Sequence, residues 1–182
     1  MMRRTILTVA ATLAACLLLL CAFYTRWFFF DGDEPLEAGH LRLIRNEGVA
    51  ALQSRDVPVG SILLFGDEVI GVGHNTVYRD SNAGGHAEIN AISDAMRKIG
   101  IERFVHLNRD SLLLITTYEP CLMCRGAILE WNIRHVEFLK GKDLLHWLRE
   151  DYRTLRYQWL RTKRAPGEMQ DTLFRMHPGG KR

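Results

Sequence analysis

The 182-residue sequence has few cysteines and little net charge, and it contains no low-complexity tract and no evident internal repeat. Four cysteines are too few for the disulfide framework that stabilises many small secreted proteins. A formal net charge of +3 at pH 7 is too small to indicate nucleic-acid binding by itself. With 47% hydrophobic and 25% charged residues, the composition is that of a globular protein long enough for one domain with a sizeable core.

The charges are unevenly placed, because basic residues are concentrated in the segment 140–164. Its basic side chains are Lys140, Lys142, Arg149, Arg153, Arg156, Arg161, Lys163 and Arg164, opposed by Asp143, Glu150 and Asp151. We favour an amphipathic helix whose arginines lie in solvent and whose Trp159 lies in the core. Two alternatives stay open: contact with nucleic acid, in which the aromatic residues would take part, and contact with anionic lipid.

A long apolar run lies near the N-terminal end of the sequence. Residues 5–24 include no charged residue, and as a helix they would be about 30 Å long, enough to cross the hydrocarbon core of a bilayer. Arg3 and Arg4 precede the run, and an aromatic cluster at 27–30 follows it, which suits a membrane interface. We therefore expect residues 1–30 to be a membrane anchor or signal segment and residues 31–35 to be a linker.

Three forms of this N-terminal segment are open. The first choice is a retained single-pass transmembrane anchor through residues 5–24. The second is a lipoprotein signal with Cys16 as the lipidated residue, and the third is a cleaved secretory peptide. The basic residues before the run favour an extracytoplasmic domain. The pair Cys121 and Cys124 argues in the other direction, because an oxidising compartment would promote a disulfide between them.

The hydrophobic pattern predicts helices that alternate with strands. Helices are expected near 36–54, 86–100, 121–131 and 143–164, and strands near 61–65, 69–72, 111–117 and 135–139. The order α-β-β-α-β-α-β-α predicts an α/β domain in which helices sandwich a sheet. This domain would cover residues 36–165, and a polar C-terminal tail would cover 166–182. In the long last helix, Leu144, Leu148 and Leu155 are expected on one apolar side.

Two short motifs carry the candidate chemistry: His86-Ala87-Glu88 and Pro120-Cys121-Leu122-Met123-Cys124. One imidazole and two thiols can hold a tetrahedral zinc ion whose fourth position is left for water, which is typical of a catalytic zinc site. Cys121 and Cys124 are three residues apart in an expected helix, so both sulfurs would lie on one face. We expect one Zn²⁺ per chain, bound by His86, Cys121 and Cys124.

Glu88 is the candidate proton carrier of this site. It follows His86 by two residues and therefore lies on another helical face, so it is a poor fourth ligand and its side chain must turn into the pocket. Zinc lowers the pKa of a bound water, and a nearby carboxylate can move protons. Water activated in this way would attack an amino-bearing carbon of a heteroaromatic ring, Glu88 would shuttle protons, and ammonia would leave.

With these residues the sequence resembles the cytidine/deoxycytidylate deaminase superfamily, in particular its tRNA-adenosine and guanine/cytosine deaminase branch, whose signature is His-x-Glu followed by Pro-Cys-x-x-Cys. The resemblance covers about 40–140 and lies in the segments 56–60, 71–75, 86–92 and 117–128. It implies a three-layer α-β-α sandwich. It also implies that Asn75 contacts the substrate through its side chain and Ala87 through its backbone.

The resemblance leaves the substrate open. Before the histidine, tRNA-editing members usually have Asp-Pro-Thr-Ala, whereas residues 81–85 here are Ser-Asn-Ala-Gly-Gly, and 86–92 resembles the deoxycytidylate branch. We expect a zinc-dependent hydrolytic deaminase that acts on the amino group of a small molecule: a nucleobase, nucleoside or nucleotide. The alternatives are an RNA-editing enzyme that resembles tRNA-adenosine deaminase, and a non-catalytic zinc-stabilised binding module. A homodimer also stays open.

Overall fold

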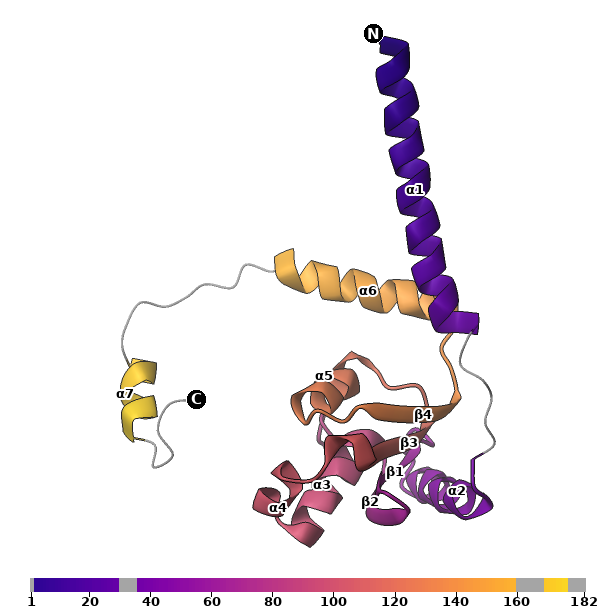
Figure 1. The fold of residues 1–182 in the computed structure, drawn as a ribbon. Helices are drawn as coiled ribbons and strands as arrows, with labels where there is room; N and C mark the ends of the chain where they lie inside the picture. The colour runs from indigo at the N-terminus through magenta and orange to yellow at the C-terminus, as the bar shows by residue number, and fades with distance from the viewer. Residues whose placement is uncertain (1, 30–35, 160–168, 177–182) are drawn as a thin grey trace. The chain divides into compact units, whose positions relative to one another are not determined.

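The computed structural model of the protein describes residues 2–29, 36–159 and 169–176 (Figure 1). They belong to two compact units, Met1–Arg42 and Leu43–Arg182. The helices are α1 (Met2–Phe29), α2 (Ala38–Gln53), α3 (Ala87–Ile99), α4 (Ile101–Val105), α5 (Leu122–Glu130), α6 (Leu144–Trp159) and α7 (Met169–Met176). The strands are β1 (Gly60–Phe65), β2 (Glu68–His74), β3 (Leu112–Tyr118) and β4 (His135–Lys140).

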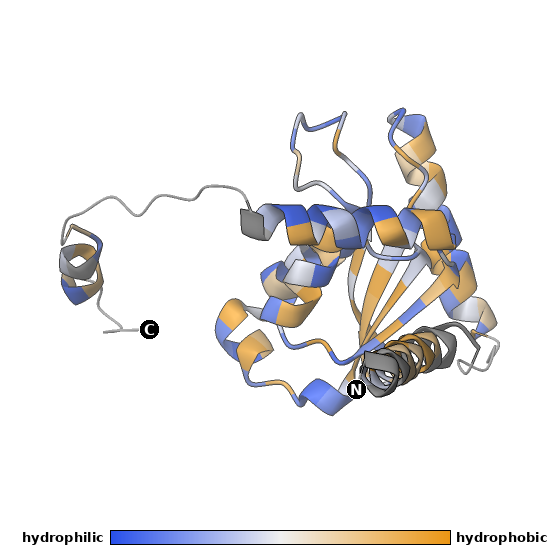
Figure 2. Ribbon diagram, turned by 90° about the horizontal axis from the view of Figure 1, so that it is seen from above, coloured by the Kyte–Doolittle hydropathy of each residue, from blue (hydrophilic) through white to orange (hydrophobic). Residues whose placement is uncertain are grey.

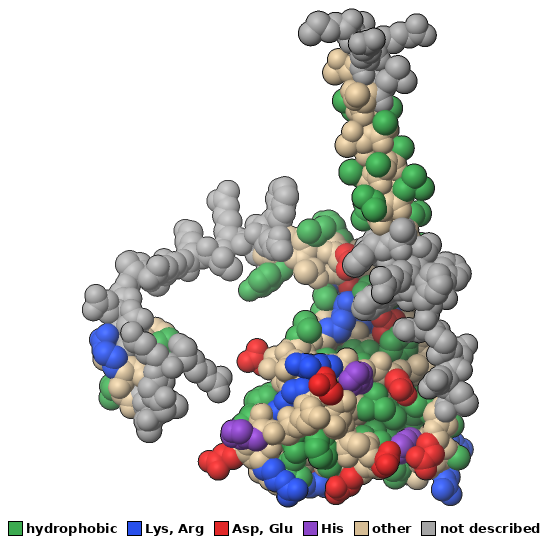
Figure 3. All heavy atoms as spheres, in the orientation of Figure 1, with side chains coloured by type: hydrophobic (Ala, Val, Ile, Leu, Met, Phe, Trp, Pro, Cys, Tyr) green, Lys and Arg blue, Asp and Glu red, His purple; other side chains and the backbone are tan. Residues whose placement is uncertain are grey.

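The N-terminal apolar run is helical, as its composition predicts, and forms most of α1. Apolar side chains are exposed along its described part, where Figure 3 shows them in green. Crossing a bilayer requires a helix of about 20 residues that stays strongly apolar throughout. Within 2–29, 36–159 and 169–176, no helix combines the necessary length and apolar character. The predicted transmembrane anchor through 5–24 is therefore wrong, and so is the single-pass membrane-anchored localisation that depended on it. The predicted linker 31–35 lies outside the described residues.

A mixed four-stranded sheet forms the centre of the second unit, with the strand order β2-β1-β3-β4. Strand β1 pairs antiparallel with β2 and with β3, whereas β3 and β4 run parallel. The helix α5 connects the two parallel strands. The strands are mainly hydrophobic (Figure 2), as expected where both faces of a sheet are covered.

Helices cover both faces of this sheet. On one face, Leu63 of β1 and Leu114 of β3 pack in a cluster with residues of α3, α4 and α5, among them Phe104. On the other face α2 approaches so closely that a Cβ at Gly60 would meet the backbone of Ile44 and Gly48. The α/β sandwich expected from the sequence is therefore present in this unit.

Glycines in β2 bring α3 close to the sheet. A Cβ at Gly71 would meet the carbonyl oxygen of Ala91, and a Cβ at Gly73 would lie 2.5 Å from the carbonyl oxygen of Ala87. Because neither glycine has a side chain, the N-terminal half of α3 lies directly on β2. This contact positions the turn that carries His86 and Glu88.

The structure differs from the sequence-based expectation towards the C-terminal end. Helix α6 forms, but Leu144, Leu148 and Leu155 are exposed, whereas Trp147 and Glu150 are buried. The side chain of Trp159 lies outside the described residues. Helix α7 lies within the segment 166–182, which was expected to be only a polar tail, and the short helix α4 was also missed.

Candidate active site

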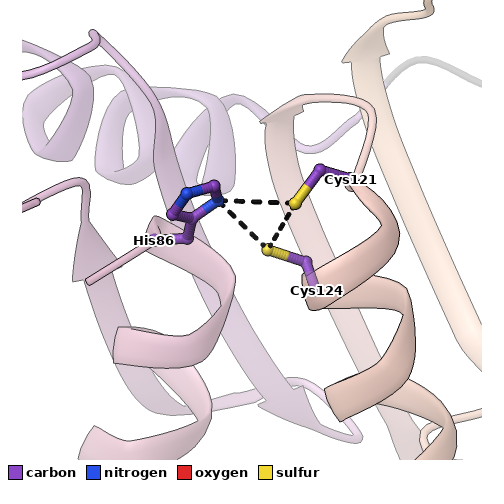
Figure 4. Close-up of side chains that lie close together, drawn as sticks. All are labelled: His86, Cys121 and Cys124. Atoms are coloured by element: carbon purple, nitrogen blue, oxygen red, sulfur yellow. Dashed lines mark hydrogen bonds between the residues drawn. The ribbon is translucent and has the colours of Figure 1, made fainter. Parts of the chain in front are cut away.

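The two sequence motifs come together at the N-terminal ends of α3 and α5 (Figure 4). His86 is the residue immediately before α3, and Cys121 holds the same position before α5. The Nδ1 atom of His86 lies 3.6 Å from the Sγ atom of Cys121 and 3.5 Å from that of Cys124, and the two sulfurs are 3.6 Å apart. The three predicted metal ligands therefore form one cluster.

These separations fit a zinc ion. Zinc–sulfur bonds of about 2.3 Å and zinc–nitrogen bonds of about 2.0 Å in a tetrahedral arrangement place two sulfurs about 3.8 Å apart and a sulfur and a nitrogen about 3.5 Å apart. The cluster matches both values to within about 0.2 Å. One nitrogen and two sulfurs are also a donor set that zinc prefers, so His86, Cys121 and Cys124 would hold this metal.

The pKa values of the two thiols are shifted in opposite directions. A hydrogen bond between the thiols lowers the pKa of Cys121 to about 5, although burial acts in the opposite direction. The same hydrogen bond raises the pKa of Cys124, and burial adds to this effect. Because the ligand form of cysteine is the thiolate, metal binding by this pair would release the remaining thiol proton.

Glu88 lies beside this cluster, and its side chain turns into the pocket although it is not on the same helical face as His86. Glu88 is only 4% exposed. Burial raises the pKa of its carboxyl group, while hydrogen bonds from the Glu88 backbone and from the Cys124 thiol lower it in part. A carboxyl group with a raised pKa can hold a proton nearer to neutral pH than an exposed glutamate can.

A cavity of about 380 Å³ opens onto these residues. His86, Glu88 and Cys121 line it at the metal cluster. The rest of the wall comes from four segments that are distant in sequence: Val57 and Val59 before β1; Asn75, Val77 and Tyr78 after β2; Tyr118 and Glu119 at the end of β3; and Lys142 and His146 around the start of α6. Its volume is in the range of small-molecule sites.

The two substrate contacts implied by the family resemblance are placed differently. Asn75 is buried and lines the cavity, and its Oδ1 accepts a hydrogen bond of 3.1 Å from the N–H of Val77. It therefore shapes a turn and also faces the cavity. Ala87 is the first residue of α3 and is completely buried, and it is not among the residues that line the cavity.

Hydrogen bonds hold the cavity wall that follows Asn75. The carboxylate of Asp56 accepts the backbone N–H of Tyr78 at 2.6 Å and that of Arg79 at 3.3 Å. Burial raises the pKa of Asp56, but these N–H groups and the hydroxyl of Ser54 outweigh it and hold the pKa below its usual range. The side chain of Asn90 in α3 donates to the carbonyl oxygen of His74 at 2.7 Å. Asp56 thus holds the cavity wall that follows β2, and Asn90 holds α3 to the last residue of β2.

The sequence pattern did not identify several of the residues that line the cavity. Tyr118 and Glu119 directly precede the Pro120 motif, so their position beside a candidate ligand was a usable signal. Lys142 and His146 follow the parallel strand β4 and reach the cavity only through the fold. No local pattern in the sequence marks them.

Comparison with known proteins agrees with this geometry. The family model described as the cytidine and deoxycytidylate deaminase zinc-binding region matches residues 39–140. The tRNA-specific adenosine deaminase of Buchnera aphidicola subsp. Schizaphis graminum is 38% identical over 95 residues, which are 52% of this chain and 60% of that protein. The tRNA-specific adenosine deaminase of Streptococcus pyogenes serotype M18 is 34% identical over 113 residues, which are 59% of this chain and 68% of that protein.

Solved structures show the same relationship. One from a study of A-to-I editing by tRNA:A34 deaminases at the wobble position of transfer RNA is 30% identical, with a TM-score of 0.51 over 58% of this chain and 76% of that chain. Guanine deaminase from Bacillus subtilis has a TM-score of 0.61 over 81% of this chain and 99% of its own, at 19% identity, which shows a shared fold. The region 39–140 matched by the family model is more than half of the chain, and it includes all three candidate ligands and Glu88. The chain therefore belongs to the cytidine and deoxycytidylate deaminase zinc-binding family.

Proposed function

We propose that the chain is a zinc-dependent hydrolytic deaminase that removes the amino group from a nucleobase ring. The observation that carries this proposal is the position of Glu88. Its carboxyl group is buried in the cavity that the metal ligands line, and burial raises its pKa. A structural zinc site has no use for a proton carrier at this place, so the arrangement argues against a binding module without catalysis.

Each side chain of the cavity has a separate role in the proposed reaction. Zinc held by His86, Cys121 and Cys124 supplies the activation of a water molecule. Glu88 accepts one proton from the attacking water and passes it to the ring nitrogen. It then takes the second proton, from the hydroxyl group added to the ring carbon, and gives it to the departing amine, so that water and the amino compound become a carbonyl compound and ammonia. Asn75, which lines the cavity, fixes the ring by hydrogen bonds from its side chain. Ala87 does not line the cavity and has no part in this proposal.

The size of the cavity supports a single base, with or without its sugar and phosphate, as the reacting group. A second candidate substrate is an adenosine in tRNA. It is favoured by the relatives of 34% and 38% identity, which are tRNA-specific adenosine deaminases. The residues 81–85 before the histidine depart from the pattern usual in that branch, which keeps the small substrates as the first candidate.

The test is an ammonia-release assay with the zinc-loaded chain. The substrates are cytosine, guanine, adenine, their nucleosides and nucleotides, and tRNA. We expect one group of them to be deaminated, and Glu88→Gln to keep its zinc but lose activity by about 10²-fold or more. Glu130→Gln is the matched control, because it makes the same change at an exposed glutamate of α5. Equal activity of Glu88→Gln and the control would contradict the mechanism, and inactivity on every substrate would contradict the function.

A further inference from the structure

Lys142 is a buried charge next to the metal cluster that the catalytic proposal does not use. It lies between β4 and α6, and its side chain is 2% exposed. Its Nζ atom donates to the carbonyl oxygen of Pro120 at 2.8 Å and to Oε1 of Glu150 at 2.8 Å. Its backbone N–H donates to Oε2 of Glu119 at 2.7 Å. Lys142 therefore holds two successive residues of the segment that leads to Cys121.

The ion pair with Glu150 is a second, separate contact of the ammonium group. Glu150 is 5% exposed in its side chain, lies on α6, and also accepts a hydrogen bond from Nη2 of Arg125 on α5. The guanidinium group of Arg125 lies 4.5 Å from the ring centroid of Trp147 on α6. The start of α6 is thus tied to the metal-binding helix α5 by charged and aromatic contacts.

The position of Pro120 makes these contacts relevant to the metal. Pro120 immediately precedes Cys121, and Cys121 is the N-cap of α5: its carbonyl oxygen accepts the N–H of Arg125 at 2.8 Å, but its backbone is extended and not helical. Cys124 lies inside the helix and is held by it. The position of the Cys121 thiol therefore depends more than that of Cys124 on the contacts made by the residues that precede it. One of those contacts is the ammonium group of Lys142 on the carbonyl oxygen of Pro120.

We propose that Lys142 is a positioning residue of the metal centre, which keeps the Sγ atom of Cys121 in place by holding the carbonyl oxygen of Pro120. A buried lysine paired with glutamate can equally well serve stability alone. The two roles are separable because Lys142 makes two bonds from one ammonium group. Glu150→Gln removes the ion pair and leaves the bond to Pro120, whereas Lys142→Met removes both.

The experiment uses the full chain loaded with Zn²⁺ or Co²⁺. The readouts are the rate of zinc release to a coloured chelator, the absorption bands of bound Co²⁺, and the melting temperature. We expect Lys142→Met to release zinc about tenfold faster and to shift the Co²⁺ bands, since removing a group that supports a ligand costs about 10- to 100-fold in metal affinity. Glu150→Gln should stay within about twofold of the unaltered chain. Arg134→Met, which removes the exposed ion pair with Asp110, is the control.

Equal zinc release and equal Co²⁺ spectra in Lys142→Met and Glu150→Gln would overturn the proposal. If Lys142→Met alone does not fold, the double variant Lys142→Met/Glu150→Gln, which leaves neither charge of this pair behind, is compared with Glu150→Gln, and the same difference is expected. The proposal rests on the metal centre and not on the substrate. An unaltered chain that bound no zinc would contradict the proposed function, whereas normal zinc binding without a specific effect of Lys142 would contradict this inference alone.

Discussion

Gly73→Ala tests whether the close contact between β2 and α3 positions the active site. The added Cβ would lie 2.5 Å from the carbonyl oxygen of Ala87 and 2.8 Å from the carbonyl carbon of Asn90, and it would also meet the backbone nitrogen of Ala91. All three are backbone atoms, so no side chain can rotate away. The start of α3, next to His86 and carrying Glu88, would have to move away from β2 by about 1 Å to restore ordinary contact distances.

We expect this movement to cost about 2–3 kcal/mol, in the upper part of the range for overpacked cores. For a domain of this size, the melting temperature would fall by about 6–12 °C. Displacement of Glu88 and His86 would also lower kcat/KM by about tenfold, because catalysis depends on sub-ångström placement. Thermal unfolding and ammonia release measure the two effects separately.

Gly126→Ala is the matched control. Gly126 lies within α5, and a Cβ there would meet no atom within 4 Å. Alanine is favoured over glycine inside a helix by about 1 kcal/mol, so this variant should be slightly more stable than the unaltered chain. A melting temperature of Gly73→Ala equal to that of Gly126→Ala would refute the steric argument.

Three further predictions address the metal, the cavity wall and the substrate contact. Cys121→Ser should lower the zinc content well below one per chain and reduce the melting temperature, because metal binding stabilises the folded state; zinc analysis that gives full occupancy would contradict this ligand assignment. Asp56→Asn should lower the melting temperature of the chain at pH 7. The difference in melting temperature should shrink as the pH falls below about 4, because a carboxyl group whose folded pKa is lowered stabilises the fold only while it is ionised. A difference in melting temperature that is independent of pH would exclude this role. Asn75→Ala should lower kcat/KM about fivefold to tenfold, the loss of one net hydrogen bond of about 1 kcal/mol, while zinc content stays unchanged; unaltered kinetics would remove Asn75 from the substrate contacts.

The cluster of candidate metal ligands could be predicted from the sequence because the spacing of these residues is local. Two cysteines three residues apart near a helix start can reach one ion, and a histidine is the usual nitrogen donor. The structure places Cys121 just before α5, one residue outside the predicted helix. Helix ends are the part of an element that sequence patterns define least well.

The surroundings of the site could not be predicted in the same way. Lys142 reaches Pro120 only because β4 lies parallel to β3, so the contact depends on the strand order. The hydrophobic spacing in α6 predicts one apolar side, but it does not say whether another element covers that side, and Leu148 is exposed. Gly71 and Gly73 give no sequence signal that α3 lies against them.

The most direct test of the central claim is the reaction of the zinc-loaded chain in ¹⁸O-labelled water, with the substrate identified in the ammonia-release assay. Hydrolytic deamination predicts that each released ammonia is accompanied by one ¹⁸O atom in the product at the former amino-bearing carbon. Glu88→Gln should form neither product at a comparable rate although it contains zinc. Ammonia release without ¹⁸O in the product, or full activity of Glu88→Gln, would contradict a hydrolytic reaction in which Glu88 moves the proton.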